Sequence, residues 1–159
     1  MSKIFFQKSQ LIIPLVFFFL SNVVIAQDDD EKPKGPIVVP KLVLDSFQTA
    51  YPGITKATWE YGQGDYEVVF AKDGVDMVVD YNVYGHCEEI ETEIKINELP
   101  QPALDYIHKN YSSFKLAGAS KIVTDNFDQA YVAQIGKEGK FWDITFDKKG
   151  KFLKEEEAD

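Results

Sequence analysis

Apolar residues recur along the chain with two different periods. Between Val43 and Tyr51 they stand three or four positions apart, which is typical of one face of a short helix. Residues 57–61, 66–70 and 75–81 instead place apolar side chains at every second position, as half-buried antiparallel strands do. Residues 88–96 continue this alternation with isoleucines on one side and charges on the other. The chain is therefore predicted to form a helix followed by a meander of strands.

The same order returns in the second half of the chain. Residues 100–111 match residues 40–51, and residues 131–150 match residues 66–85 without a gap. Both matched strand segments keep glycines at their turns, "KDG" and "KEG", where a positive φ costs glycine nothing. The charged ending "FLKEEEAD" predicts a short fourth strand in the second copy.

Two such copies predict an α+β fold. One helix-and-strand unit alone would bury only a marginal core. Joining the two sheets edge to edge, with both helices on one face, removes two exposed strand edges and buries one shared core. We therefore expect a tandem repeat of a helix plus a three- to four-stranded antiparallel meander, joined into one sheet.

The first residues are typical of a targeting segment. Lys3 and Lys8 precede the apolar run Leu11–Leu20, and the small residue Ala26 follows it. This order predicts a secretory signal peptide over residues 1–26. A membrane anchor is the alternative, but the run is short for a bilayer span. We expect a periplasmic or secreted protein.

The rest of the chain divides by composition into three segments. The polar, proline-rich stretch that follows the signal peptide predicts a flexible leader. The two repeats together are expected to form one domain. The predicted bounds are 27–37 for the leader, 38–97 for the first repeat and 98–159 for the second.

Charge limits the classes of partner. The net charge is −9, and every one of the 17 basic residues is a lysine. This argues against a nucleic acid partner, because phosphate binding needs a basic patch and usually arginine forks. An acidic surface keeps an exported protein soluble, and steering of basic partners is the alternative role.

No catalytic group, metal site or cofactor site is predicted. Cys87 has no partner for an internal disulfide, and its match to Phe152 predicts that it packs as a small apolar side chain. His86 and His108 lack a second ligand at metal spacing. Residues 125–128, "DNFD", predict a solvated turn rather than a calcium loop. We therefore expect a protein that is not an enzyme.

A dense acidic run follows Cys87. Alternation places Glu89, Glu91 and Glu93 on one face of a strand, and we expect that face to be exposed, because unpaired buried carboxylates are costly. A sheet edge protected by like charge is the favoured interpretation. Paired carboxylates for glycoside hydrolysis are the alternative.

The sheet face away from the helices is the candidate binding surface. It is predicted to mix apolar and acidic side chains, as a protein-binding face does, with Phe141 as an aromatic anchor. An ordinary solvated face is the alternative. The residues assigned to partner binding are Glu67, Val69, Asp76, Val78, Asp80, Phe141 and Asp143.

Several motifs resemble those of a known family. In the stretch "VLDSFQTAYPGITKATWEYGQGDYEVVFAKDGVDMVVDYNVYG", a helix ending in Tyr51 and Pro52 precedes Trp59, a "YEVVF" strand and the turn glycine Gly85. These features, together with "LPQPALDYIHKNY" and "YVAQIGKEGKFWDITFDKKGKFL", resemble the PepSY-like, beta-lactamase-inhibitor-protein-like secreted proteins of Bacteroidetes. The resemblance covers residues 38–155.

The second copy departs from this pattern, with Ser112 at the proline position and Ala119 near the tryptophan position. The resemblance implies a tandem α/β fold with a continuous antiparallel sheet. Related folds bind proteins, including hydrolases, as inhibitors, or act as inhibitory or chaperone-like segments.

We therefore expect a secreted, non-enzymatic binding module that engages a protein or peptide partner through the open sheet face. An envelope hydrolase that the module inhibits is one such partner. The alternative is a periplasmic small-ligand or cation-binding protein, and an enzyme using carboxylates is a weaker alternative.

Overall fold

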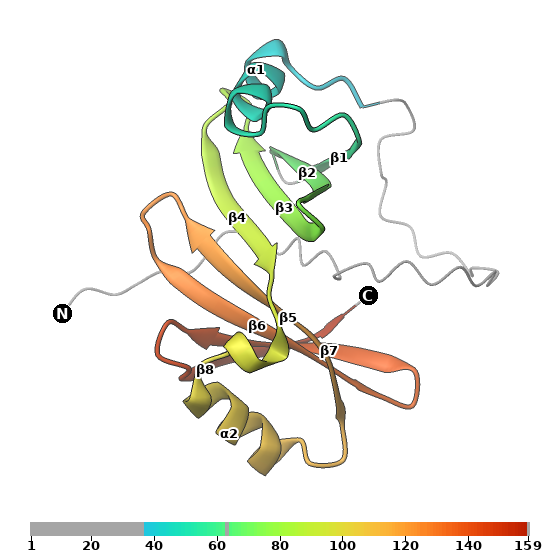
Figure 1. Ribbon diagram of the computed structural model, residues 1–159, viewed down its shortest axis with the longest axis vertical. Coiled ribbons are helices and arrows are strands. Elements are labelled where there is room, and N and C mark those ends of the chain that lie inside the picture. Colours follow the sequence, from blue (N-terminus) through green and yellow to red (C-terminus); the bar gives the residue numbers. More distant parts are fainter. Residues whose placement is uncertain (1–36, 63, 159) are drawn as a thin grey trace.

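One antiparallel sheet runs through the whole molecule, with a helix at either end (Figure 1). This computed structural model describes residues 37–62 and 64–158. The eight strands pair in chain order, from β1 to β8. The predicted signal peptide, and all of the predicted leader except Ile37, lie outside the described residues.

The elements follow one another as a helix and four strands, twice. This composition confirms the predicted α+β class. The first half contains α1 (Lys41–Ala50), β1 (Ala57–Gly62), β2 (Asp65–Lys72), β3 (Val75–Asn82) and β4 (Cys87–Glu93). The second half contains a 3-10 helix, η1 (Ile96–Glu98), then α2 (Gln101–Asn110), β5 (Lys115–Thr124), β6 (Gln129–Lys137), β7 (Lys140–Asp147) and β8 (Phe152–Ala158).

The two helices are built alike. A proline occupies the N-cap position of each, where its missing N–H removes no helical hydrogen bond. Each ends where a tyrosine N–H donates to a carbonyl one turn back: Tyr51 to Phe47 and Tyr111 to Ile107, both at 2.8 Å. Val43 and Phe47 of α1, and Ala103 and Ile107 of α2, are buried against the sheet, whereas Leu44 at a periodic position of α1 is 38% exposed.

The "KDG" and "KEG" turns have the conformation that their sequence predicts. Asp73 and Gly74 have φ values of 54° and 79°, and Glu138 and Gly139 have 54° and 82°. Two consecutive positive φ values are typical of a two-residue type I′ hairpin. These hairpins set the register of β2 with β3 and of β6 with β7.

Both helices lie on the same face of the sheet, but they do not share a core. The side chains under α1 form one buried cluster, and those under α2 form another. The first cluster is Val43, Phe47, Tyr51, Val68, Phe70, Val79 and Tyr81. The second is Leu99, Ala103, Ile107, Ala119, Ala133, Ile135, Ile144 and Phe146. The prediction of a single shared core is therefore wrong.

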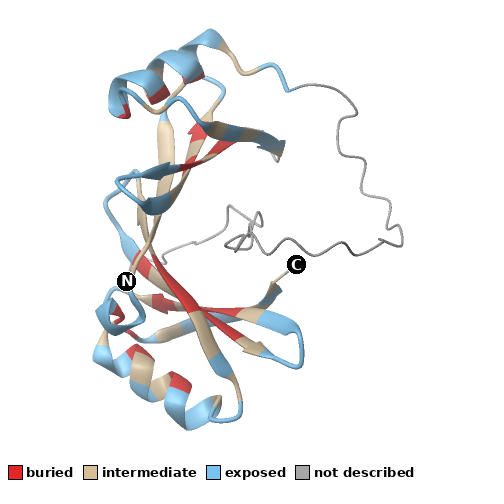
Figure 2. Cartoon of the chain, turned by 45° about the vertical axis from the view of Figure 1, so that its right-hand side comes forward, coloured by how far each residue is buried: buried red, intermediate tan, exposed pale blue. Residues whose placement is uncertain are grey.

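The junction between the halves explains the division. β4 pairs directly with β5, so the sheet is continuous as predicted, and the helix-side pairs at the junction are Ile90 with Val123 and Thr92 with Lys121. Ile90 packs against the first cluster, but Val123, Thr92 and Lys121 belong to neither cluster, so the buried apolar contacts stop at this border. Neighbouring strands also rotate by about 20–25° relative to one another, so over eight strands the two helices turn away from each other. Figure 2 shows the result, a curved molecule with the helices on its outer side.

The last strand also differs from the prediction. β8 has seven residues, as many as β4, and pairs with β7 from Phe152 to Ala158. The prediction of a short fourth strand was wrong because charged side chains on an edge strand can point to solvent while the backbone still pairs. The match of Cys87 to Phe152 is confirmed, since each packs against the core cluster of its own half.

Candidate functional site

The sheet face away from both helices, here called the inner face, carries all seven residues assigned to partner binding. Pairing places Glu67 opposite Asp80 and Val69 opposite Val78 on β2 and β3. In Figure 2 this face lines the inside of the curve. Because side chains two positions apart share a face, Asp76 joins the set from β3, and Phe141 and Asp143 join it from β7.

The inner face is less open than the sequence suggested. Glu67 and Asp143 are buried, with only 5% and 6% of their surface exposed. Phe141, by contrast, remains 43% exposed. Asp76 is exposed as well, and Val69, Val78 and Asp80 are half-buried. The expectation of a uniformly uncovered face is thus wrong for two of its carboxylates, because the sheet curves toward that side.

Four carboxylates stand in a row across the first half of the inner face. Glu60 on β1 pairs with Glu67, Glu67 pairs with Asp80, and Asp80 pairs with Glu89 on β4. Adjacent strands are about 4.8 Å apart, so this acidic row is a chain of directly opposed like charges. Such an arrangement destabilises the folded state when all four groups are ionised.

Burial and mutual repulsion raise the pKa values within the acidic row. The pKa of Glu67 rises from 4.5 to about 8, first through burial and then through Asp80, Glu60 and the glutamates of β4. The pKa of Glu89 rises to about 7 and that of Asp80 to about 6, in both cases mainly through burial. Carboxyl groups of the acidic row therefore hold protons near neutral pH.

Glu67 is the least satisfied member of the row. Among the described residues its buried Oε1 has no hydrogen-bond partner. The charged groups that raise its pKa, from β1, β3 and β4, are all carboxyl groups. An unpaired buried carboxyl oxygen is costly, so its presence in a folded protein calls for an explanation.

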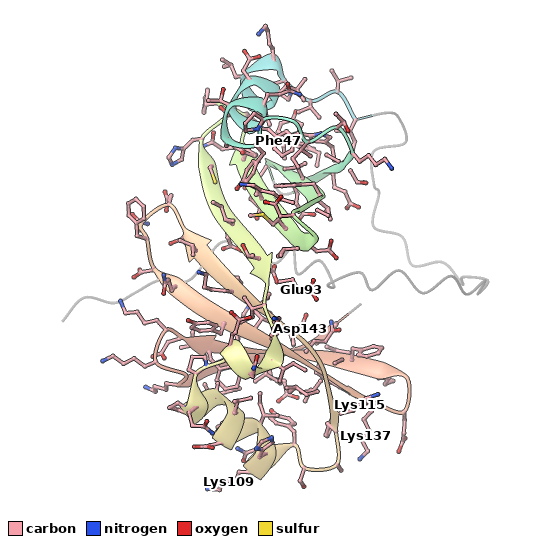
Figure 3. All side chains as sticks on the ribbon, in the orientation of Figure 1. Phe47, Glu93, Lys109, Lys115, Lys137 and Asp143 are labelled. Atoms are coloured by element: carbon pink, nitrogen blue, oxygen red, sulfur yellow. The ribbon has the colours of Figure 1, made fainter. Side chains whose placement is uncertain are left out.

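Two other carboxylates on the inner face, half-buried Glu91 and buried Asp143, do have partners. Ser120 on β5 donates to Glu91, and Gln134 donates to Asp143 across 3.3 Å. Figure 3 places Glu93 and Asp143 near the middle of the molecule, between the two helix-covered ends. Burial raises the pKa of Asp143, and the hydrogen bond from Gln134 opposes that rise. Glu91 and Asp143 therefore each accept a side-chain hydrogen bond, unlike the Oε1 atom of Glu67.

Apolar side chains flank the acidic row. Val69 and Val78 pair with each other two positions along the strands from Glu67 and Asp80. Val78 also pairs with Glu91 on β4, and Glu91 pairs with Ile122 on β5, so this row of paired positions crosses four strands. This apolar row is interrupted only by Glu91, and it is half-buried along its length.

Phe141 lies at the far end of the inner face, over a glycine. It pairs with Gly136, and a methyl group at Gly136 would stand 2.8 Å from Phe141 Cε1. The ring therefore rests on the bare backbone of β6, and a Cβ there would force it to move. Its position is set before any partner arrives.

The prediction that the acidic run after Cys87 lies exposed at a sheet edge is wrong. β4 is a central strand between β3 and β5, not an edge, and Glu89, Glu91 and Glu93 are half-buried. A bulge between Asp80 and Tyr81 sets the register of β3 with β4, so that Asp80 meets Glu89. Glu60 and Glu89 belong to the acidic row but were not assigned to the site. Alternation within β1 and β4 could have placed them on that face, whereas their opposition depends on pairing.

The "DNFD" turn lies at the β5–β6 hairpin, beside the β3–β4 turn. Asp125 Oδ2 is 3.5 Å from His86 Nε2, and Phe127 is 85% exposed with a φ of 59°. Residues 37–62 and 64–158 contain no group of three His, Cys, Asp or Glu side chains that could hold a metal ion. Neither α1 nor α2, the α-helices of the described chain, has the length and apolar content needed to cross a membrane.

Comparison with known proteins supports the relationship that the motifs implied. A family model described as "Putative beta-lactamase-inhibitor-like, PepSY-like" matches the chain twice, at residues 35–84 and 64–154. No curated protein matches the chain.

Several solved structures share the fold. One, from Bacteroides eggerthii and described as "putative periplasmic proteins", has a TM-score of 0.68 at 18% identity, covering 76% of this chain and 89% of that one. A DUF2874 family protein from Bacteroides uniformis has a TM-score of 0.66 at 16% identity, covering 74% and 88%. A BLIP-like protein from Bacteroides fragilis has a TM-score of 0.62 at 23% identity, covering 77% and 89%. With its motifs, its fold and the family match over most of its length in agreement, this chain belongs to the PepSY-like, beta-lactamase-inhibitor-like family.

Proposed function

We propose that the protein is an exported, non-enzymatic binding module whose inner face holds a protein or peptide partner. The class of partner that we expect is a hydrolase of the cell envelope, which the module would inhibit. Export is supported by the targeting pattern of residues 1–26 and by the periplasmic description of the relative from Bacteroides eggerthii. The family description and the BLIP-like relative support the inhibitory role.

The observation that carries this proposal is the composition of the inner face. No helix of the described residues covers it, yet it keeps half-buried apolar side chains, Val69 and Val78, beside carboxylates. Protein-binding surfaces combine apolar anchors with a polar rim in this way. Phe141, partly exposed and seated on Gly136, is a preorganised aromatic of the kind that contributes strongly to interfaces.

Site-specific crosslinking tests the proposal. A photoreactive amino acid is placed at Phe141 or at Val132 on the inner face, and the protein is expressed in its native cells. We expect both positions to crosslink to the same envelope protein. The matched control carries the photoreactive residue at Leu42, which is 59% exposed on α1 and faces away from the inner face.

Two results would count against inner-face binding. One is crosslinking from Leu42 with no product from the inner face. The other is equal recovery of the same partner by the unmodified protein and by Phe141→Ala and Glu67→Gln variants. The isolated envelope partner should also lose hydrolytic activity when the module is added.

The acidic row gives the cation-carrier alternative a specific basis. A carrier binds its ligand in the folded state, so calcium or a small ligand would raise its melting temperature. A melting temperature unchanged by a panel of metals and small ligands is the outcome expected of a protein-binding module.

A further inference from the structure

We propose that the acidic row binds a lysine or arginine side chain of the partner, with Glu67 as the central ligand. This inference rests on the proposed function and names the chemistry that the inner face recognises. It is carried by the buried Oε1 atom of Glu67, which has no hydrogen-bond partner among the described residues, by the row of opposed acids around it, and by a comparison of the two halves of the chain.

The fold does not need these acids. Glu60, Glu67, Asp80 and Glu89 pair across β1 to β4. The corresponding positions pair in the same way across β5 to β8, and they carry Ser120, Val132, Thr145 and Lys154. The same scaffold thus forms with neutral and basic side chains at these positions. The repulsion in the first half is a property of the surface rather than a requirement of the sheet.

Within residues 37–62 and 64–158, the charged groups that act on Glu67 at the centre of the acidic row are all carboxyl groups. Glu67 faces Glu60 from β1, Asp80 from β3, and Glu89 and Glu91 from β4. Lys154 acts on Glu89 at the border of the row, but it forms its own ion pair with Glu156 on β8. A cation from outside would satisfy Oε1 of Glu67 and relieve the repulsion among its neighbours.

The geometry favours an organic cation over a metal ion. A calcium ion needs six or more oxygen ligands that converge on one point. The acidic row instead presents one carboxylate per strand at a spacing of about 4.8 Å, and a guanidinium or ammonium group can bridge two such neighbours. The adjacent Val69 and Val78 offer apolar surface on which the aliphatic stem of a lysine or arginine would lie.

Selection from a random peptide library tests this chemistry without knowledge of the partner. The folded protein is immobilised at neutral pH and physiological salt, and displayed twelve-residue peptides are selected on three versions of it. These are the wild type, Glu67→Gln, and the control Asp105→Asn on the exposed surface of α2. Glu67 is partly protonated at neutral pH because its pKa is raised to about 8, so Asp105→Asn reduces the general attraction of basic peptides at least as much as Glu67→Gln does.

We expect the wild type and Asp105→Asn to enrich peptides with lysine or arginine at one fixed position. An arginine at that position is then replaced by citrulline, which keeps the shape and removes the charge. Affinity should fall about tenfold or more, as for loss of a charge-assisted hydrogen-bond pair. Glu67→Gln should weaken the same peptide by a similar factor, and Asp105→Asn by less than about twofold.

The acidic row also predicts a pH dependence of the selected peptide. The groups with raised pKa values, Glu67, Asp80 and Glu89 with Glu91 beside them, must lose their protons to hold a cation. Affinity should therefore rise between pH 5 and pH 8 in the wild type and rise less in Glu67→Gln.

The outcomes separate this inference from the proposed function. Enriched peptides that need Phe141 but have no fixed basic residue would overturn the cation ligand and leave inner-face binding standing. Peptides insensitive to both Phe141→Ala and Glu67→Gln, or no enrichment at all, would overturn both. Equal weakening by Glu67→Gln and Asp105→Asn would reduce the effect to general attraction and also reject the inference.

Discussion

The two halves of the molecule share a scaffold and differ in the surface they present. Each has a helix capped by proline, four strands and a type I′ hairpin. In each, a glycine after the third strand meets the start of the helix. A methyl group would stand 2.7 Å from Leu42 O at Gly85 and 2.8 Å from Ala103 N at Gly150. The features that build the fold are thus repeated in both halves.

The inner face is not repeated. The acid-to-acid pairs of the first half are replaced in the second by Val132 opposite Thr145, and by Thr145 opposite Lys154. Conversely, the second half has Phe141 opposite Gly136, where the first has Asp76 opposite Ala71. A residue type present in both copies indicates a need of the fold. A residue type present in one copy points to a role for that surface.

Replacing the shared glycines should have the largest effect. Gly85→Ala and Gly150→Ala each combine a positive φ with a clash against helix backbone. We expect each to lower the free energy of unfolding by about 2–4 kcal/mol. Urea unfolding followed by circular dichroism measures this loss.

The control for this pair is Gly74→Ala. Gly74 has a φ of 79°, but nothing lies within 4 Å of a methyl group there. Its loss should be limited to backbone strain, about 1–2 kcal/mol. Equal losses at Gly74, Gly85 and Gly150 would show that the approach of the helices to these turns does not matter.

Stability should fall as pH rises, because of the first half. The pKa of Glu67 moves from 4.5 in the unfolded chain to about 8, that of Glu89 to about 7, and that of Asp80 from 3.8 to about 6. Between these values the folded state binds more protons than the unfolded state, so each step up in pH favours unfolding. The stability is complete below the unfolded pKa values and is lost toward pH 8.

The expected loss between pH 5 and pH 8 is about 2 kcal/mol, after a discount for solvent around the half-buried Asp80 and Glu89. Chemical denaturation at a series of pH values gives the slope. A free energy of unfolding that is flat or rises over this window would contradict the raised pKa values.

Much of the scaffold was predictable because its signals are local. The period of Val43 and Phe47 predicted α1, and the glycines of "KDG" and "KEG" predicted hairpins that the φ values confirm. Side-chain alternation also placed Glu67 and Asp80 on one face, because that inference needs only a strand. The continuity of the sheet followed from the need to cover strand edges.

The features missed depend on pairing and curvature. That Glu89 stands opposite Asp80 depends on a bulge, and that β4 is central depends on its pairing with β5. The division of the core depends on which residues β4 and β5 bring together, because Val123, Thr92 and Lys121 join neither cluster. The burial of Glu67 depends on the curve of the whole sheet. None of these is encoded within one segment of sequence.

Giving the first half the inner-face residues of the second should remove the pH effect. The variant Glu67→Val, Asp80→Thr, Glu89→Lys introduces side chains that already pack at these positions in β6, β7 and β8. We expect a gain of about 1–2 kcal/mol at pH 8 and little change at pH 5, since repulsion is removed only where the acids are ionised. The reciprocal Val132→Glu should lose stability at pH 8. A triple variant less stable than the wild type at pH 8 would mean that the acids support the fold.

The smallest expected effect concerns the packing of the Phe141 ring on Gly136, a contact found only in the second half. Alanine in place of glycine within a strand gains about 0.5–1 kcal/mol from reduced backbone entropy. In Gly136→Ala this gain should be cancelled, because the new methyl group would lie 2.8 Å from Phe141 Cε1 and the ring must move. In the Phe141→Ala background the ring is gone and the gain should reappear, as the presence of Ala71 at the matching position of the first half suggests.

A double-mutant cycle of thermal unfolding should therefore give a coupling of about 0.5–1.5 kcal/mol between Gly136 and Phe141. Additive single effects would show that Phe141 does not rest on the glycine and is free to adopt other positions before a partner binds.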